Sequence, residues 1–323
     1  MHTSFKKQVS NLHNQKKNMI SVFITEFIRI KDVMLWCVIS FGGFILGLSS
    51  LDLSSNLIPL LVFLTSTFFI MSFTFAINNY YDIDSDKKNP RRMHINAIAL
   101  NRISKKTGGF LIMVFTIIPL VVTYFFRMEV FIFCAFLLFL GWGYSAPPLR
   151  TKNVPGLDVI WHFLGFFFYV IWGSIISGSI GLINWLAAIS IGIFSCICQV
   201  DNHIRDYFYD KDSGTETIAV WMGLDNAKTI LKILTIFHLI FLIPLILLYS
   251  LSYYFTIIII IVMPILGLIV LRPKKGAFPS KRSYIYYFTF WIGGAVYISC
   301  LIFYICFLLG IPTLGLLDFI GLA

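Results

Sequence analysis

The sequence predicts an all-α membrane protein, because its composition, the length of its apolar runs and the one-sided placement of its basic residues agree. Hydrophobic residues make up 58% of the 323 residues, charged residues only 12%, and the mean hydropathy is +0.86. Soluble domains carry about 25% charged residues, so this chain has too little polar surface to cover itself in water. These proportions exclude a soluble nucleic-acid binder, a disulfide-stapled secreted domain and a disordered tail protein.

About nine apolar runs are long enough for transmembrane helices, each of which needs about 20 residues. The runs cover approximately residues 33–51, 57–77, 108–126, 129–145, 157–179, 182–200, 229–249, 253–271 and 285–309. We therefore divide the chain into a polar N-terminal tail over 1–20 and one polytopic membrane domain over 21–323. Apolar and charged residues mix over 21–32, which predicts an amphipathic lead-in at the membrane interface.

The basic residues fall almost entirely on one side of this arrangement. With nine spans, 24 of the 25 Lys and Arg residues lie in the N-terminal segment or in the loops after the second, fourth, sixth and eighth spans. Only Arg127 falls on the other side. The positive-inside rule then places the N-terminus and these loops in the cytoplasm. This topology explains most of the net charge of +10 without a nucleic-acid partner.

Two Asp-rich motifs of the same spacing follow the second and the sixth spans. The first consists of Asn78, Asp82 and Asp86, and the second of Asn202, Asp206 and Asp210. All three positions are offset by 124 residues, which is also the length of four spans with their loops. This repeat indicates an internal duplication of a four-helix unit.

The spacing within each motif predicts a metal site. Residues at i, i+4 and i+8 lie on one helical face, where like charges repel each other. Carboxylates near a membrane boundary are costly unless a cation pairs with them, and carboxylate and amide oxygens suit Mg²⁺. One such motif alone is better explained as ordinary solvated carboxylates at a helix end. Two motifs in register after equivalent spans favour the cation site.

The same loops carry cations that would complete a clamp for a diphosphate group. They are Lys87, Lys88, Arg91, Arg92, Arg150, Lys152 and Arg205, and Arg29 lies just before the first span. Arg and Lys side chains together with Mg²⁺ bind phosphate oxygens strongly. Membrane topology alone is the alternative explanation for each of them. Tyr144, at the end of the fourth span, either donates a hydrogen bond to a phosphate or belongs to the aromatic belt.

Two further polar residues lie close to the second motif or inside a span. We expect His203 to be a solvated surface residue rather than a base or a ligand. Asp158, at the start of the fifth span, is a candidate functional residue, because carboxylates inside membranes are rare.

Several segments together resemble the UbiA superfamily of intramembrane prenyltransferases, from about Phe27 to about Gly223. The segments are Phe27–Asp32, Asn78–Asp86, Asn89–Arg92, Arg102–Ser104, Tyr144–Lys152 and the run from Asp206 through Asp210 and Gly214 to Thr217. The resemblance implies nine helices around a central cavity, with a cytoplasmic cap formed by the loops that carry the Asp-rich motifs.

The resemblance also implies roles for individual residues. Mg²⁺ would be bound by Asn78, Asp82, Asp86, Asn202, Asp206 and Asp210, and the four aspartates would be the catalytic groups. The diphosphate would be contacted by Arg29, Arg92, Tyr144, Arg150 and Lys152, with Asn78 and Asn202. The sequence departs from the family pattern at Asn79 and Met93, where Asp and Pro are usual, and at His203, where several members have Asp.

The function expected from both lines of reasoning is Mg²⁺-dependent transfer of a polyprenyl group from a polyprenyl diphosphate, of geranylgeranyl type, to a lipophilic acceptor. Candidate acceptors are a prenylglyceryl phosphate, a carotenoid and a quinone precursor. A membrane carrier is one alternative, supported by the repeated four-span unit. An isoprenoid-binding homologue without turnover is the other, suggested by Asn79.

Overall fold

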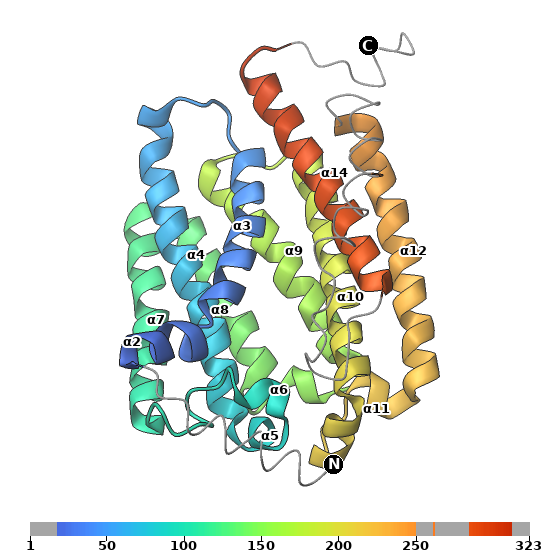
Figure 1. The fold of residues 1–323 in the computed structure, drawn as a ribbon. Helices are drawn as coiled ribbons and strands as arrows, with labels where there is room; N and C mark the ends of the chain where they lie inside the picture. Colours follow the sequence, from blue (N-terminus) through green and yellow to red (C-terminus); the bar gives the residue numbers. More distant parts are fainter. Residues whose placement is uncertain (1–17, 250–260, 262–283, 312–323) are drawn as a thin grey trace. The chain divides into compact units, whose positions relative to one another are not determined.

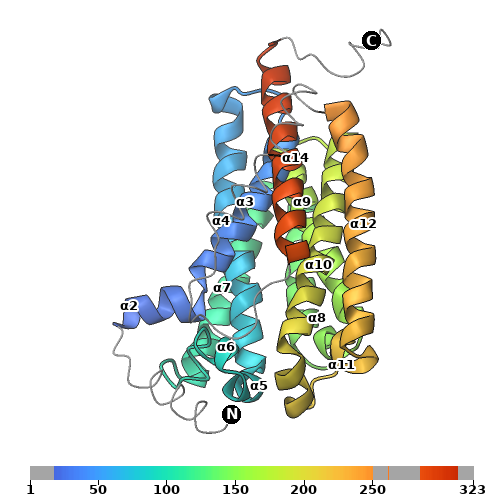
Figure 2. The same cartoon turned by 45° about the vertical axis from the view of Figure 1, so that its right-hand side comes forward.

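The computed structural model describes residues 18–249, 261 and 284–311, and these residues are helical without any strand (Figures 1 and 2). Seven of the helices are long and apolar enough to cross a membrane. They are α4 (Leu53–Tyr81), α7 (Lys105–Phe126), α8 (Met128–Ser145), α9 (Leu157–Ser177), α10 (Leu182–Ser213), α12 (Leu224–Tyr249) and α14 (Tyr284–Leu308). The predicted all-α class and multi-pass membrane character are therefore confirmed.

The remaining two predicted spans have different outcomes. The run over 33–51 corresponds to α3 (Ile30–Leu46), whose 17 residues end five positions before the predicted limit. At 1.5 Å per residue such a helix is about 25 Å long, which is short for a bilayer core of about 30 Å. The run over 253–271 lies outside the described residues. A total of nine spans thus stays a prediction.

The chain forms two compact units. Among the described residues, unit 1 comprises 18–38, 61–154 and 211–215, and unit 2 comprises 39–60, 155–210 and the described residues from 216 onward. In unit 1, α7 packs against α8, and in unit 2, α12 packs against α14 (Figure 1). The single domain over 21–323 and its internal duplication stay predictions.

Unit 1 begins with the predicted lead-in, which is helical but bent. Helix α2 (Met19–Val22) continues into a π-helical turn over Phe23–Phe27, and Arg29 then adopts a left-handed conformation with φ of 61°. Met19 is two-thirds exposed, whereas Phe27 is fully buried and its ring lies 6.2 Å from that of Phe115. The lead-in is thus amphipathic, as expected. Its place at a membrane interface stays a prediction.

In unit 2, helices α3 and α9 approach closely through small residues. A Cβ atom on Gly43 would lie 2.1 Å from the carbonyl oxygen of Val170, and one on Gly173 would lie 2.3 Å from that of Ser40. The hydroxyl of Ser40 donates to the Tyr169 carbonyl at 2.6 Å. Small residues and hydroxyl hydrogen bonds are the usual means by which helices associate in membranes.

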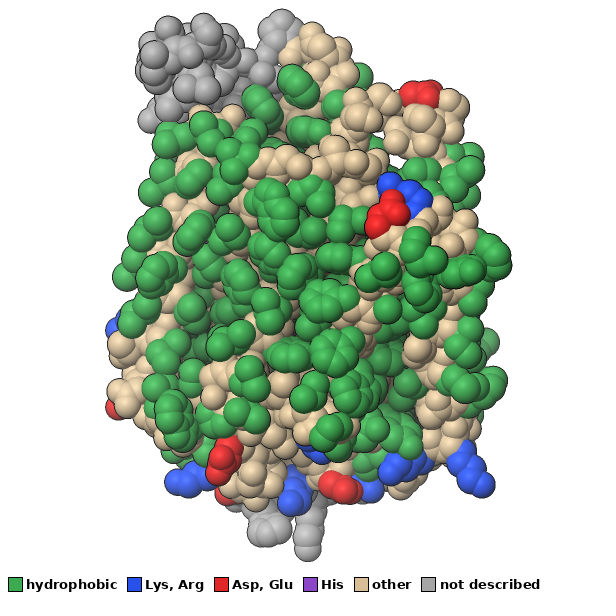
Figure 3. Space-filling model, turned by 180° about the vertical axis from the view of Figure 1, so that it is seen from behind, with side chains coloured by type: hydrophobic (Ala, Val, Ile, Leu, Met, Phe, Trp, Pro, Cys, Tyr) green, Lys and Arg blue, Asp and Glu red, His purple; other side chains and the backbone are tan. Residues whose placement is uncertain are grey.

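The surface has the distribution of side chains expected for a membrane protein. Figure 3 shows one face on which hydrophobic side chains cover the middle, while most of the visible charged side chains lie along one edge. Exposed hydrophobic residues such as Phe125, Ile132 and Ile236 would be costly in water but suit contact with lipid chains.

Candidate functional site

The first Asp-rich motif lies at a break between two helices in unit 1. Helix α4 ends at Tyr81, Asp82 occupies the N-cap position, and α5 (Ile83–Lys88) carries Asp86. The helical face predicted for the motif is therefore interrupted by a break between α4 and α5 at Asp82. However, the Asp82 N–H donates to the Asn78 carbonyl at 3.0 Å, and the Asp86 N–H to the Asp82 carbonyl at 2.8 Å. Because these bonds keep the i→i−4 pattern, the three residues still occupy successive turns.

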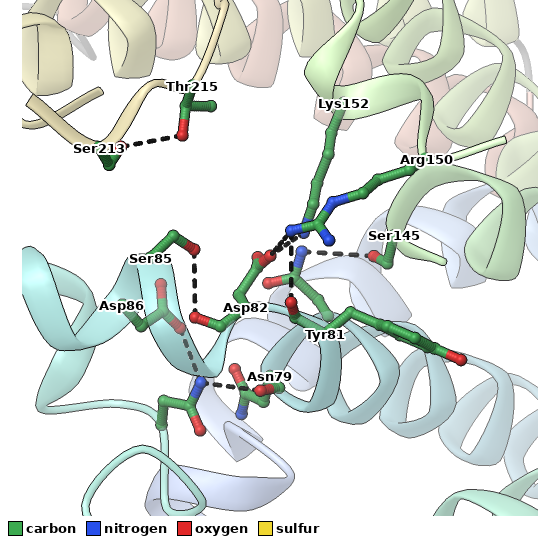
Figure 4. Close-up of polar contacts among 12 residues, drawn as sticks. Asn79, Tyr81, Asp82, Ser85, Asp86, Ser145, Arg150, Lys152, Ser213 and Thr215 are labelled. Carbon is green, nitrogen blue, oxygen red and sulfur yellow. Dashed lines mark hydrogen bonds and ion pairs between the residues drawn. The ribbon is translucent and has the colours of Figure 1, made fainter. Parts of the chain in front are cut away.

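Asp82 is paired with two of the predicted cations (Figure 4). The Lys152 ammonium forms an ion pair with Oδ1 of Asp82, and Nη2 of Arg150 lies 3.3 Å from the same oxygen. Arg150 also donates to the Tyr81 carbonyl at 3.3 Å. Both cations follow the end of α8, and Arg150 has a φ of 37°, which any non-glycine residue adopts rarely. The backbone after α8 thus directs two positive charges at one carboxylate.

Asp86 is held by a buried amide network. Its Oδ2 accepts from Nδ2 of Asn96 at 2.7 Å, and the same nitrogen lies 2.9 Å from the Asn79 carbonyl (Figure 4). The Asn96 side-chain oxygen accepts from the N–H groups of Ile98 and Ala99, both at 3.1 Å. Asn96 lies in the loop 94–103, and no pattern in the sequence points to it, since an asparagine in a loop gives no local signal.

Asn79, a departure from the family pattern, has a structural role. Its side chain is 1% exposed, and Nδ2 donates to the Glu26 carbonyl at 3.0 Å. Glu26 in turn forms an ion pair with Arg102, so the lead-in is connected to the loop after α6 (Pro90–Met93). An ionised aspartate has no hydrogen to donate to a carbonyl oxygen, and this explains an asparagine here.

The electrostatics of the site reflect burial and crowding of charge. Burial, and next the charge of Asp82, raise the pKa of Asp86 to about 6, while the hydrogen bond from Asn96 and the charges of Arg92 and Lys152 oppose the shift. Burial lowers the pKa of Lys152, and the charge of Asp82 opposes that change. Two carboxylates that repel each other in a partly dry site would be stabilised by a further cation.

The other predicted residues of unit 1 lie at varying distances from this cluster. Nδ2 of Asn78 donates to the Ser145 hydroxyl at 3.3 Å. Ser145 is the last residue of α8, and the half-buried Tyr144 directly precedes it. Arg92 is near enough to act on the pKa of Asp86. Arg29, by contrast, forms an ion pair with Asp32 at 2.6 Å and lies over the ring of Phe75, so these contacts are with residues outside the cluster around Asp82.

The second motif belongs to helix α10 in unit 2. Asn202 and Asp206 lie within this continuous helix of 32 residues, and Asp210 follows one turn later, as predicted. Asp206 is 4% exposed, and the side-chain oxygen of Asn202 accepts from Arg205. Residues 211–215, which follow Asp210, group with unit 1, and there the hydroxyls of Ser213 and Thr215 lie 2.9 Å apart (Figure 4).

The expectation that His203 is a solvated surface residue is wrong. His203 is 5% exposed, and its Nε2 lies 3.0 Å from Oδ2 of Asp158, which is fully buried in the first turn of α9. The Nε2 amide of Gln199 lies 2.8 Å from the same histidine nitrogen. The histidine is buried because it meets a carboxylate from a neighbouring helix, and no local pattern in the sequence reveals this pairing.

The donor atoms of unit 1 fit Mg²⁺ rather than a metal that takes nitrogen or sulfur ligands. Within the described part of the chain, no three His, Cys, Asp or Glu side chains are grouped so that they could hold a metal by themselves. The first motif instead offers two carboxylates and one amide oxygen. Mg²⁺ often uses one or two carboxylates and completes its shell with water and substrate phosphates.

Solved structures with the same fold include a UbiA homologue and a digeranylgeranylglyceryl phosphate synthase. A UbiA homologue from Archaeoglobus fulgidus bound to GPP and Mg²⁺ is 20% identical, with a TM-score of 0.62 over 87% of this chain and 98% of that chain. A digeranylgeranylglyceryl phosphate synthase is 17% identical, with a TM-score of 0.64 over 89% and 99%. At these identities the likeness shows the fold.

Curated relatives include two proteins named for carotenoid chemistry. A lycopene elongase/hydratase of Corynebacterium glutamicum is 26% identical over 182 residues, which are 54% of this chain and 63% of that protein. A C(50) β-cyclic carotenoid biosynthesis protein of Dietzia sp. (strain CQ4) is 25% identical over 166 residues, which are 48% and 37%. The chain thus matches less than two thirds of the length of these relatives.

A model of the UbiA prenyltransferase family matches residues 35–292, which is most of the chain. This range includes both Asp-rich motifs, the cations that contact Asp82, six of the seven long helices and the first residues of α14, up to residue 292. The protein therefore belongs to the UbiA prenyltransferase family.

Proposed function

We propose that this protein transfers a polyprenyl group from a polyprenyl diphosphate to a lipophilic acceptor inside the membrane and releases diphosphate. The observation that carries the proposal is the group around Asp82. Two adjacent carboxylates and two cations meet at the end of a long apolar helix, in a chain whose family consists of prenyltransferases. Such a combination of charges suits a diphosphate head whose apolar tail lies among the helices.

The first motif would hold Mg²⁺ through Asp82, Asp86 and the oxygen of Asn78, whose amide nitrogen is used by Ser145. Mg²⁺ bound there would neutralise the charge that develops on the leaving diphosphate. Asn202, Asp206 and Asp210 would form the matching set for the same diphosphate. The equal spacing of the two motifs, 124 residues apart and after equivalent spans, supports this pairing.

The residues of the chain would then act on a bound donor in three ways. Arg150 and Lys152 would bind diphosphate oxygens and orient the bond between C1 and oxygen, which breaks with its electron pair going to diphosphate. A carbon–carbon double bond of the acceptor supplies the electron pair for the new bond to C1, and the acceptor cation loses a proton. Apolar side chains of the spanning helices would exclude water, which would otherwise capture the cation.

An acyclic carotenoid is the acceptor that the comparisons favour, because both curated relatives described above are named for carotenoid chemistry. Such an acceptor reaches the site from the lipid bilayer, consistent with the apolar surface of the long helices. The motifs would face the cytoplasm, where diphosphate is released, as the distribution of basic residues indicates.

The test is purified protein in detergent with Mg²⁺, a series of prenyl diphosphates up to geranylgeranyl, and three acceptors analysed by mass spectrometry. The acceptors are lycopene, a prenylglyceryl phosphate and a quinone-precursor ring. A prenylated carotenoid together with released diphosphate is expected, and EDTA should abolish both. Product only with another acceptor would refute the carotenoid proposal. Isoprenoid flux in liposomes without any product would instead support the carrier alternative.

The role of the first motif is tested by Asp82→Asn with Asp84→Asn as the matched control. Both aspartates lie at α5, but Asp84 is exposed and has no part in the proposed site. We expect Asp82→Asn to lower the transfer rate at least about 100-fold, as for loss of a group that stabilises developing charge. Asp84→Asn should retain nearly full activity. Equal rates in the two variants would contradict the assigned role.

A further inference from the structure

A buried acid and a buried histidine connect helices α9 and α10 in unit 2, directly before the second motif. Asp158 has no exposed surface, and its Oδ2 lies 3.0 Å from Nε2 of His203. Gln199, on the turn of α10 before His203, contacts the same nitrogen at 2.8 Å. A carboxylate without access to water is costly unless a polar partner holds it, so Asp158 and His203 constrain each other.

The position of His203 along α10 relates this pair to the second motif. Gln199, His203, Asp206 and Asp210 follow each other at intervals of four, three and four residues, which places them along one face of a helix. His203 therefore lies one turn before Asp206, on the same side of α10. A contact that fixes His203 also fixes the direction in which Asp206 and Asp210 point.

Holding α9 and α10 together does not by itself require a buried charge. Deeper in the same pair of helices, the Ser195 hydroxyl donates to the His162 carbonyl at 3.0 Å. The Cys196 thiol donates to the Val159 carbonyl at 3.4 Å. These contacts join the helices through neutral groups. The pair of Asp158 and His203 lies where the motif begins, which points to a task beyond packing.

We propose that Asp158, acting through His203, is a positioning residue for the second motif. It fixes the rotation of α10 against α9 and thereby aims Asp206 and Asp210 at the metal and diphosphate. This inference rests on the proposed function of that motif. It also gives the departure at His203 a role: the histidine holds this face of α10 against Asp158 and is not itself a metal ligand.

The experiment measures Mn²⁺ binding by electron paramagnetic resonance in the full-length purified protein with inorganic diphosphate, without turnover. The variants are Asp158→Ala, His203→Ala, the double variant and the conservative Asp158→Asn. Asp206→Asn identifies the part of the signal that belongs to the second motif. Ser195→Ala is the matched control, because it removes a link between the same two helices about two turns of α10 before His203.

We expect Asp158→Ala and His203→Ala each to weaken Mn²⁺ binding at the second motif about tenfold or more, as loss of an outer-sphere partner does. The double variant should be no weaker than either single variant, because the two residues act as one unit. Asp158→Asn, which keeps a polar side chain of the same size beside His203, should recover part of the affinity. Ser195→Ala should bind Mn²⁺ like the unmodified protein, whatever its effect on the unfolding temperature.

Unchanged Mn²⁺ affinity in Asp158→Ala and His203→Ala would overturn the inference while leaving the proposed function intact. If both alanine variants fail to fold, Asp158→Asn and His203→Gln decide the matter by the same titration, and unmodified affinity in both overturns it. No Mn²⁺ binding by the unmodified protein, even with diphosphate, would refute the proposed function itself and the inference with it.

Discussion

Asn79 shows how a single side chain changes meaning when its contacts are known. In the sequence it is a departure from the family motif and the main argument for a homologue without turnover. In the structure its amide donates to the Glu26 carbonyl and is fully buried. Asn79 thus joins the lead-in to α4, while Asn78, Asp82 and Asp86 keep the oxygens suited to a metal. The departure no longer argues against catalysis.

Replacing Asn79 with aspartate should therefore destabilise the protein. The substitution Asn79→Asp would place a carboxylate against carbonyl oxygens, with a cost of about 3 kcal/mol for an unpaired buried charge. Thermal unfolding in detergent measures the effect. Asn101→Asp is the control, since Asn101 is exposed and its φ of 56° is one that aspartate tolerates. Equal stability of the two variants would show that the contacts of Asn79 are unimportant.

At the scale of elements, the long apolar runs predicted the helices well and the polar contacts poorly. Seven predicted spans coincide with long helices to within a few residues at most ends, because about 20 apolar residues in a bilayer have few alternatives to a helix. The second motif was placed correctly on one helix. The break at Asp82 and the pairing of His203 with Asp158 depend on partners distant in the sequence, which spacing does not reveal.

Helices α3 and α9 carry a prediction at this scale. Gly173→Val should prevent their close approach, because its side chain would meet backbone atoms of α3 that cannot move aside. Overpacking of this kind costs about 3 kcal/mol or more, and the yield of folded protein should fall. Gly165→Val is the control in the same helix, since nothing lies within 4 Å of its Cβ position. Size-exclusion chromatography and thermal unfolding distinguish the two, and similar profiles would contradict the packing argument.

For the whole molecule, the chain is a multi-pass membrane protein of the UbiA prenyltransferase family, and its orientation stays a prediction from charge. Cysteine labelling in intact cells tests it. Ser54, in the first turn of α4, and Asp84, just after its last residue, are both exposed, and each is replaced with cysteine in turn. A membrane-impermeant maleimide should label only Ser54→Cys beyond the background of the unmodified protein. Labelling of Asp84→Cys alone would reverse the proposed orientation.

The central claim is that both Asp-rich motifs hold metal ions around one diphosphate. A crystal structure with Mn²⁺ and an unreactive thiolodiphosphate donor tests this most directly, because anomalous scattering locates each metal. We expect Mn²⁺ between the diphosphate and the carboxylates of Asp82 and Asp86, and again beside Asp206 and Asp210. A diphosphate bound away from either motif, or motifs that open toward opposite sides of the membrane, would contradict the account.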